Sequence, residues 1–69
     1  MKIVTLEFYE CEHNGDLDNY TSDIRSCGGR IIQSRVDTDD EVGVVRFEVD
    51  DYPKFMEAFK ETDAFQFLN

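Results

Sequence analysis

The first ten residues of the chain alternate between two kinds of position. One side of the alternation is apolar and carries Val4, Leu6 and Phe8. The other side is mixed and carries Ile3, Thr5, Glu7 and Tyr9. A period of two is typical of a strand with one buried face. The pattern therefore predicts a first strand over residues 2–10.

The period changes to three and four residues after the turn dipeptide Asn14-Gly15. Apolar side chains then recur at Leu17, Tyr20, Ile24 and Cys27. A stripe of this kind is typical of a helix that buries one face. It predicts a helix over residues 16–27 that ends at Gly28-Gly29, because glycine readily adopts the left-handed conformation that often ends a helix.

The second half of the chain predicts two further strands, over residues 30–36 and 42–50, which the polar loop 37–41 separates. Asp51 precedes Tyr52-Pro53 and predicts a helix start, because proline is tolerated in the first turn of a helix. An apolar stripe then continues to Phe59. Residues 64–68 predict a final strand, with Phe65 and Phe67 facing inward.

The predicted order of elements is βαββαβ. This order usually folds as a four-stranded antiparallel sheet with two helices on one face. We therefore expect an α+β ferredoxin-like sandwich, formed as a single domain over residues 1–69. Five phenylalanines fall on inward positions and are expected at the centre of the core: Phe8, Phe47, Phe55, Phe59 and Phe67.

The composition narrows the class of protein. A chain of 69 residues has room for one small core only. Its aromatic content of 13% is too high for a disordered acidic tail. No apolar run approaches the roughly 20 residues of a membrane-spanning helix, and two cysteines are too few for a disulfide scaffold. We expect a soluble cytoplasmic protein with no membrane partner.

The chain has 16 acidic and 7 basic residues, and its net charge is −9. In the predicted topology the first two strands run in the same direction and the third runs against them. The loop after the first strand, the loop 37–41 and the loop after the second helix would then meet at one end, with Glu61 and Asp63 in the last of these. We expect a partner-binding surface there, formed by Glu10, Glu12, Asp16, Asp18, Asp37, Asp39, Asp40 and Glu41.

Two interpretations of this acidic surface are open. Charged loops can simply keep a small protein soluble, or a field of one sign can guide an oppositely charged partner. We favour a non-enzymatic interaction protein that binds a basic surface on a nucleic-acid-binding protein. Direct binding of nucleic acid is not expected, because it depends on Lys and Arg contacts to phosphates. As a class, compact acidic domains of this kind resemble phage-encoded viral inhibitors, including anti-CRISPR proteins and DNA mimics.

The open face of the predicted sheet is a second candidate surface. Its apolar positions are Ile3, Tyr9, Ile31 and Val44. A half-apolar face is typical of a surface that packs against a second copy or a partner, although scattered exposed apolar residues are also normal. The face predicts a homodimer contact.

Residues that could carry chemistry are few. His13 is the single histidine and has no Ser or Cys nucleophile at a motif spacing. Cys11, Glu12 and His13 are adjacent, but a zinc site needs three or four ligands, and Cys27 lies a helix length away. We therefore predict no catalytic activity, no metal site and no cofactor.

Two short motifs resemble the ACT domain family. Gly15-Asp16-Leu17, followed by Gly28-Gly29-Arg30-Ile31, is similar to its pattern of Gly-x-Leu, a short helix and Gly-x-x-Ile. The resemblance extends over the whole chain in the order of elements. It implies, as an alternative function, a regulatory homodimer that senses an amino acid through the loop Asn14, Gly15, Asp16 and Leu17.

Overall fold

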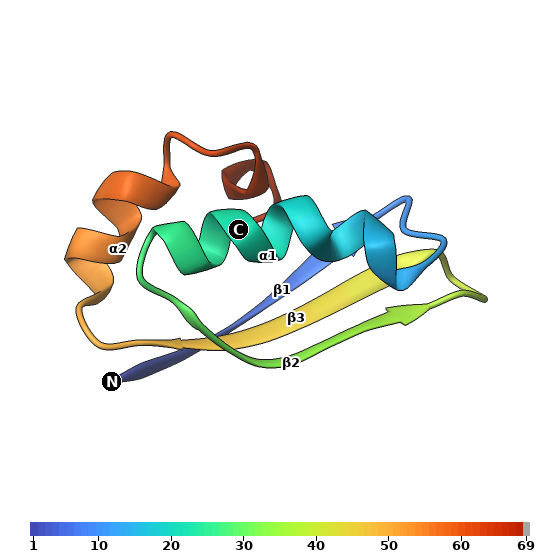
Figure 1. Ribbon diagram of the computed structural model, residues 1–69, viewed down its shortest axis with the longest axis horizontal. Helices are drawn as coiled ribbons and strands as arrows, with labels where there is room; N and C mark the ends of the chain where they lie inside the picture. The colour runs from blue at the N-terminus through green and yellow to red at the C-terminus, as the bar shows by residue number, and fades with distance from the viewer. Residues whose placement is uncertain (69) are drawn as a thin grey trace.

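The protein is described by a computed structural model over residues 1–68 (Figure 1). The elements in chain order are β1 (Lys2–Tyr9), η1 (Asn14–Leu17), α1 (Asp18–Ser26), β2 (Arg30–Asp37), β3 (Val42–Val49), α2 (Tyr52–Phe59) and η2 (Asp63–Phe67), where η marks a 3₁₀ helix. Among the described residues, none of these helices has the length and apolar character needed to cross a membrane.

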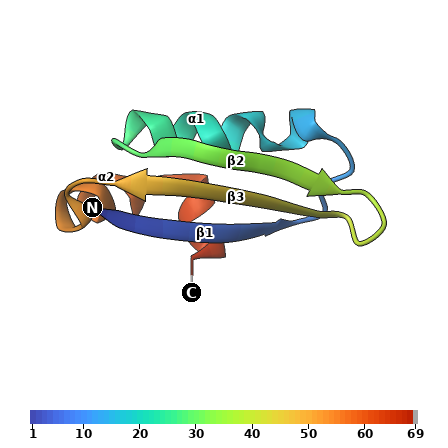
Figure 2. The same cartoon turned by 90° about the horizontal axis from the view of Figure 1, so that it is seen from below.

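The three strands form one antiparallel sheet in the order β1-β3-β2. Both β1 and β2 pair antiparallel with β3, so β1 and β2 run in the same direction, as predicted. The helices lie on one face of this sheet (Figure 1), and the other face is open toward the viewer in Figure 2.

The core lies between the sheet and the helices. Phe8 and Phe47 from the sheet are fully buried, as is Phe59 from α2, and Phe55 is 2% exposed. These four residues confirm the predicted centre of the core. Phe67 differs, because it is only half-buried and packs against the side of the core.

Two glycines allow α1 and η1 to approach the sheet closely. A Cβ atom at Gly29 would lie 2.5 Å from Cγ2 of Ile24 and 3.1 Å from Cδ2 of Phe47. A Cβ atom at Gly43 in β3 would overlap the buried side chain of Leu17. The missing side chains therefore leave room for two of the core residues on the helix layer.

The prediction of a fourth strand, and with it the four-stranded ferredoxin-like sandwich, is wrong. The sheet has three strands, and residues 63–67 form η2 instead. In a 3₁₀ helix, residues three apart share one face. Ala64 and Phe67 share a face in this way and pack on the core, whereas Phe65 is 37% exposed. The alternation of Phe65 and Phe67 suggested a strand. The residues that pack on the core are instead Ala64 and Phe67, which are three apart, as a 3₁₀ helix requires.

The predicted position of Ile31 on the open face is also wrong. Ile31 pairs with Phe47, whose side chain is buried under the helices, and Ile31 itself packs against the core. A β-bulge then shifts the register between Ile31 and Gln33. Ile32 lies in this bulge and is 52% exposed. The bulge lets two isoleucines follow each other in a strand whose neighbours alternate.

Candidate functional site

The strand register brings two acidic segments to the same end of the molecule. Val42, the first residue of β3, pairs with Tyr9 at the end of β1 and with Asp37 at the end of β2. The segment after β1 and the β2–β3 turn are therefore neighbours (Figure 1). We call this region the acidic end and define it by Glu10, Glu12, Asp16, Asp18, Asp37, Asp39, Asp40 and Glu41.

The two segments are also joined through their backbones. The Cys11 amide donates a hydrogen bond to the Glu41 carbonyl at 2.8 Å. Glu10, which precedes Cys11, and Glu41, which accepts the bond, have positive φ angles of 63° and 56°. Residues other than glycine keep such a conformation only where the surrounding structure holds it. The bond and the buried Cys11 side chain therefore hold the acidic segments in one arrangement.

Asp16 has a structural role within the acidic end. Its Oδ2 atom accepts hydrogen bonds from the Glu12 amide at 2.8 Å and the His13 amide at 3.2 Å. The His13 ring nitrogen Nδ1 lies 3.3 Å from the same oxygen. The two amide bonds hold the pKa of Asp16 below its ordinary value, because they favour the ionised carboxylate. Asp16 thus shapes the segment that leads from β1 into η1.

The β2–β3 turn presents its carboxylates to solvent. All five of its residues, 37–41, are exposed. Asp37 Oδ1 accepts a hydrogen bond from the Asp39 amide at 3.1 Å, which stabilises the start of the turn. Asp18 begins α1 at the same end of the molecule and is exposed, as is Glu12. Asp39 and Asp40 lie in the middle of the turn, each two residues from the nearest strand.

The loop after α2 does not belong to the acidic end as the sequence predicted. α2 begins beside the opposite end of the sheet, and the chain then turns back over the middle of the molecule into η2 (Figures 1 and 2). The helix has only eight residues, about 12 Å at 1.5 Å per residue. It is too short to carry Glu61 and Asp63 along the full length of the sheet.

The opposite end of the molecule has a different charge pattern. Arg30 in β2 contacts Glu48 at 2.8 Å and Asp50 at 3.0 Å. These carboxylates raise the pKa of Arg30, and its hydrogen bonds lower the pKa of Asp50. Lys2 lies over the ring of Tyr52, 3.9 Å from its centre. This end therefore carries charges of both signs, with Arg30 paired to two carboxylates.

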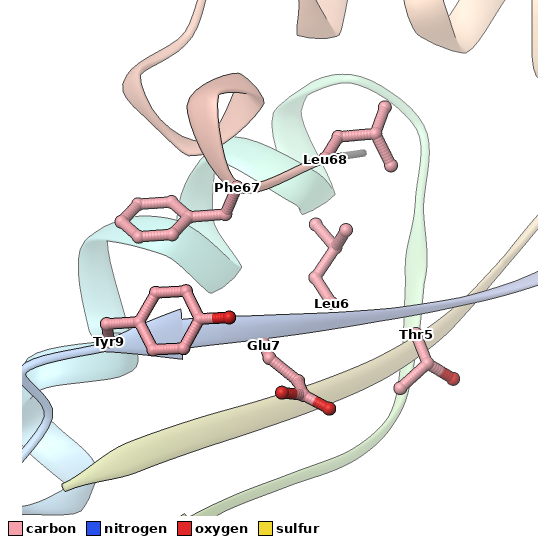
Figure 3. Close-up of a pocket in the computed structure, with 6 residues that line it drawn as sticks. All are labelled: Thr5, Leu6, Glu7, Tyr9, Phe67 and Leu68. Atoms are coloured by element: carbon pink, nitrogen blue, oxygen red, sulfur yellow. The ribbon is translucent and has the colours of Figure 1, made fainter.

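The absence of a fourth strand exposes a second candidate site, which the sequence did not predict. β1 is an edge strand, and a groove of about 290 Å³ lies between it and η2. We call it the β1 groove; its lining residues are Thr5, Leu6, Glu7, Tyr9, Phe67 and Leu68 (Figure 3). The predicted strand 64–68 would have filled this place, so the alternating pattern concealed it.

The open face of the sheet carries three of the four apolar residues predicted there. Ile3 is 43% exposed, Tyr9 is 60% exposed and Val44 is half-buried. Val44 pairs across the sheet with Glu7, and Ile3 pairs with Glu48. The apolar residues are therefore interleaved with charged ones, while Tyr9 lies at the β1 edge and also lines the β1 groove.

Two of the four residues of the loop implied by the ACT resemblance, Asp16 and Leu17, have structural roles. Leu17 is 1% exposed within the core, and Asp16 binds backbone amides. Burial raises the pKa of the nearby Cys11 thiol, which disfavours the reactive thiolate. Within residues 1–68, no three His, Cys, Asp or Glu side chains gather into a group that could hold a metal ion.

The chain was compared with protein-family models, with curated proteins and with solved structures. None of these comparisons yields a match.

Proposed function

We propose that this chain is a non-enzymatic interaction protein whose acidic end docks on a basic surface of another protein. The observation that carries the proposal is the joining of two separate acidic segments by the strand register and by the bond from Cys11 to Glu41. This connection holds the backbones of the two acidic segments together before a partner binds. Binding then costs little ordering entropy, which favours affinity.

The charge distribution supports a partner of opposite sign. The net charge is −9, and the exposed turn 37–41 carries four acidic residues without a basic one. A field of this kind accelerates encounter with a positive surface and repels nucleic acid. Basic surfaces of sufficient extent are typical of proteins that bind nucleic acid. We therefore propose a partner of that class, in a reducing cytoplasm where free Cys11 and Cys27 persist.

The test begins with immobilised protein and a cell extract, washed at low and then at high salt. We expect a basic protein to be retained at low salt and released at high salt, because screening weakens attraction between exposed charges. Association of the purified partner is then measured against the Asp39→Lys, Asp40→Lys double variant. We expect slower association, by about tenfold or more at low salt, and a weaker dependence on salt.

A double variant far from the acidic end provides the matched control. Glu57→Lys with Glu61→Lys changes the net charge by the same amount on exposed positions of α2 and the loop that follows it. It should associate at nearly the unaltered rate. Equal slowing by both double variants would show that only total charge matters and would refute docking through the acidic end.

A further inference from the structure

The two edges of the sheet differ in how well they are protected against pairing with another strand. Exposed edge strands offer unpaired backbone N–H and C=O groups, and proteins usually block them with bulges and charges. β2 has both devices, a bulge between Ile31 and Gln33 and the charged residues Arg30 and Arg35. The β1 edge has no bulge in its described residues, Lys2–Tyr9, and its charged residues are Lys2 at the start of the strand and Glu7, so the bulge is what distinguishes the two edges. It is the edge that is suited to accept a strand.

Three exposed apolar side chains lie in or next to β1. Five large hydrophobic residues of the described chain are well exposed, and Met1, Ile3 and Tyr9 are three of them. Figure 3 shows Tyr9 below Phe67, with Leu68 farther along the same side of the strand. The β1 groove therefore offers an incoming strand the edge of β1 on one side and the apolar side chains of Phe67 and Leu68 on the other, with Thr5 and Glu7 as polar lining residues. We propose that its occupant is β1 of a second copy of this chain, paired antiparallel about a two-fold axis.

The symmetry restricts how two such strands can align. A two-fold axis that relates antiparallel neighbours in one sheet is perpendicular to that sheet, so helix-facing residues pair with helix-facing residues. Residues on one face of β1 are either all even-numbered or all odd-numbered, so each residue must pair with one of the same parity. The numbers of two paired residues therefore add to an even value. The two alignments of this kind with the greatest overlap centre on Thr5 or on Leu6.

The alignment centred on Leu6 matches the side chains better. On the open face it pairs Ile3 with Tyr9 of the second copy, and on the helix face it pairs Val4 with Phe8. Pairs of aromatic and β-branched residues stabilise neighbouring strands. The alignment centred on Thr5 instead pairs Ile3 with Glu7 and Lys2 with Phe8. We therefore assign the register centred on Leu6.

The charges of the whole molecule agree with this arrangement. Antiparallel pairing places the acidic end of each copy beside the opposite end of the other copy, where Lys2 and the N-terminus lie (Figure 2). It also brings Lys2 near Glu10 of the second copy. The two acidic ends point away from each other and remain open, so pairing at β1 is compatible with docking of a basic partner.

Sedimentation equilibrium of the full chain tests the proposal at low and moderate salt. We expect a mass twice the 8.1 kDa of one chain at high protein concentration. Ile3→Glu should weaken self-association by about tenfold or more, since a tenfold change corresponds to only 1.4 kcal/mol. Ile32→Glu is the matched control on the β2 edge and should leave self-association unchanged. A monomer at millimolar concentration, or equal weakening by both variants, would overturn the proposal.

Disulfide trapping tests the register. In the assigned alignment Thr5 pairs with Glu7 of the second copy, so a mixture of the Thr5→Cys and Glu7→Cys variants should form a covalent dimer on mild oxidation. Thr5→Cys alone should form little, whereas it would crosslink efficiently in the alignment centred on Thr5. The unaltered protein controls for Cys11 and Cys27. Efficient crosslinking of Thr5→Cys alone would refute the register. Because none of these measurements involves the basic partner, failure here leaves the acidic end to its own test.

Discussion

At the scale of single residues, the acidic end contains carboxylates with different tasks. Asp16 accepts two backbone hydrogen bonds and helps to set the path of the chain from β1 to η1. Asp39 and Asp40 lie on the exposed turn. The sequence places all three in acidic loops, but only the coordinates separate the carboxylate that supports the loop from those that are available to a partner.

The role of Asp16 predicts a pH dependence. Its pKa in the folded protein lies below the ordinary value of 3.8, so its stabilising effect is present above that value and is lost as the pH falls through the folded-state pKa. Asp16→Asn should therefore lower the free energy of unfolding at neutral pH, and the difference from the parent should shrink below pH 3.8. Urea denaturation of both proteins, at neutral pH and at a pH below 3.8, measures this difference in the free energy of unfolding.

The matched control for this prediction is Asp40→Asn, which removes an exposed carboxylate from the β2–β3 turn. It should not reproduce the shrinking difference. A loss in Asp16→Asn that is the same at both pH values would contradict the role of the ionised Asp16 side chain.

At the scale of elements, η2 is the segment on which sequence and structure disagree. Its backbone bonds are local, including the Leu68 amide to the Phe65 carbonyl at 3.0 Å. Phe67 then packs on rings from two other elements, with its centre 4.9 Å from that of Phe8 and 5.3 Å from that of Tyr20. These contacts attach η2 to the helix layer and leave β1, among the described residues, without a paired strand on one side.

Removal of this aromatic contact should loosen the C-terminal segment. Replacement of a fully buried phenylalanine by alanine lowers the free energy of unfolding by about 3–5 kcal/mol. Phe67 is half-buried, so we expect Phe67→Ala to lower the free energy of unfolding by about 2 kcal/mol. Denaturant titration measures this loss.

Phe65→Ala is the control for size and position. Phe65 is 37% exposed and meets Phe59 at a ring distance of 6.2 Å. Its loss should be smaller, about 1 kcal/mol. Equal losses for Phe65→Ala and Phe67→Ala would contradict this packing, because both rings face inward in the predicted strand.

At the scale of the whole molecule, the charge is polarised along the sheet. The turn between β2 and β3 is acidic, and the opposite end carries Lys2 and the network of Arg30 with Glu48 and Asp50. A large net charge destabilises a compact state through repulsion of like charges. The proposed binding surface therefore carries a cost in stability, which a basic partner would relieve.

This repulsion predicts that salt stabilises the protein. Added sodium chloride should raise the Tm, because screening reduces repulsion among exposed carboxylates. Asp39→Lys with Asp40→Lys changes the net charge from −9 to −5, since each substitution removes one negative charge and adds one positive charge. Its Tm should be higher at low salt and should rise less with salt. A Tm of the unaltered protein that falls with salt would contradict this account.

Elements with a strong local pattern could be read directly from the chain. The alternation around Phe8, the helical stripe through Ile24 and the start of α2 at Asp51 are all present in the structure, and the Asp51 side chain accepts the Lys54 amide at 3.2 Å. The parallel direction of β1 and β2 also followed from the order of elements. The strand, the helical stripe and the helix start depend on neighbouring residues, so a linear pattern is sufficient to find them, whereas the direction of β1 and β2 depends on how the elements are connected.

Tertiary structure alone decided the fate of residues 63–67, the position of Ile31 and the free edge of β1. Phe65 and Phe67 fit a strand in the sequence, but the packing of Phe67 against Phe8 and Tyr20 selects a 3₁₀ helix. The bulge beside Ile31 likewise depends on pairing with β3. In each case the outcome depends on contacts between residues that are far apart in the chain. These contacts form only when the sheet and the helices are assembled, so a local pattern does not reveal them.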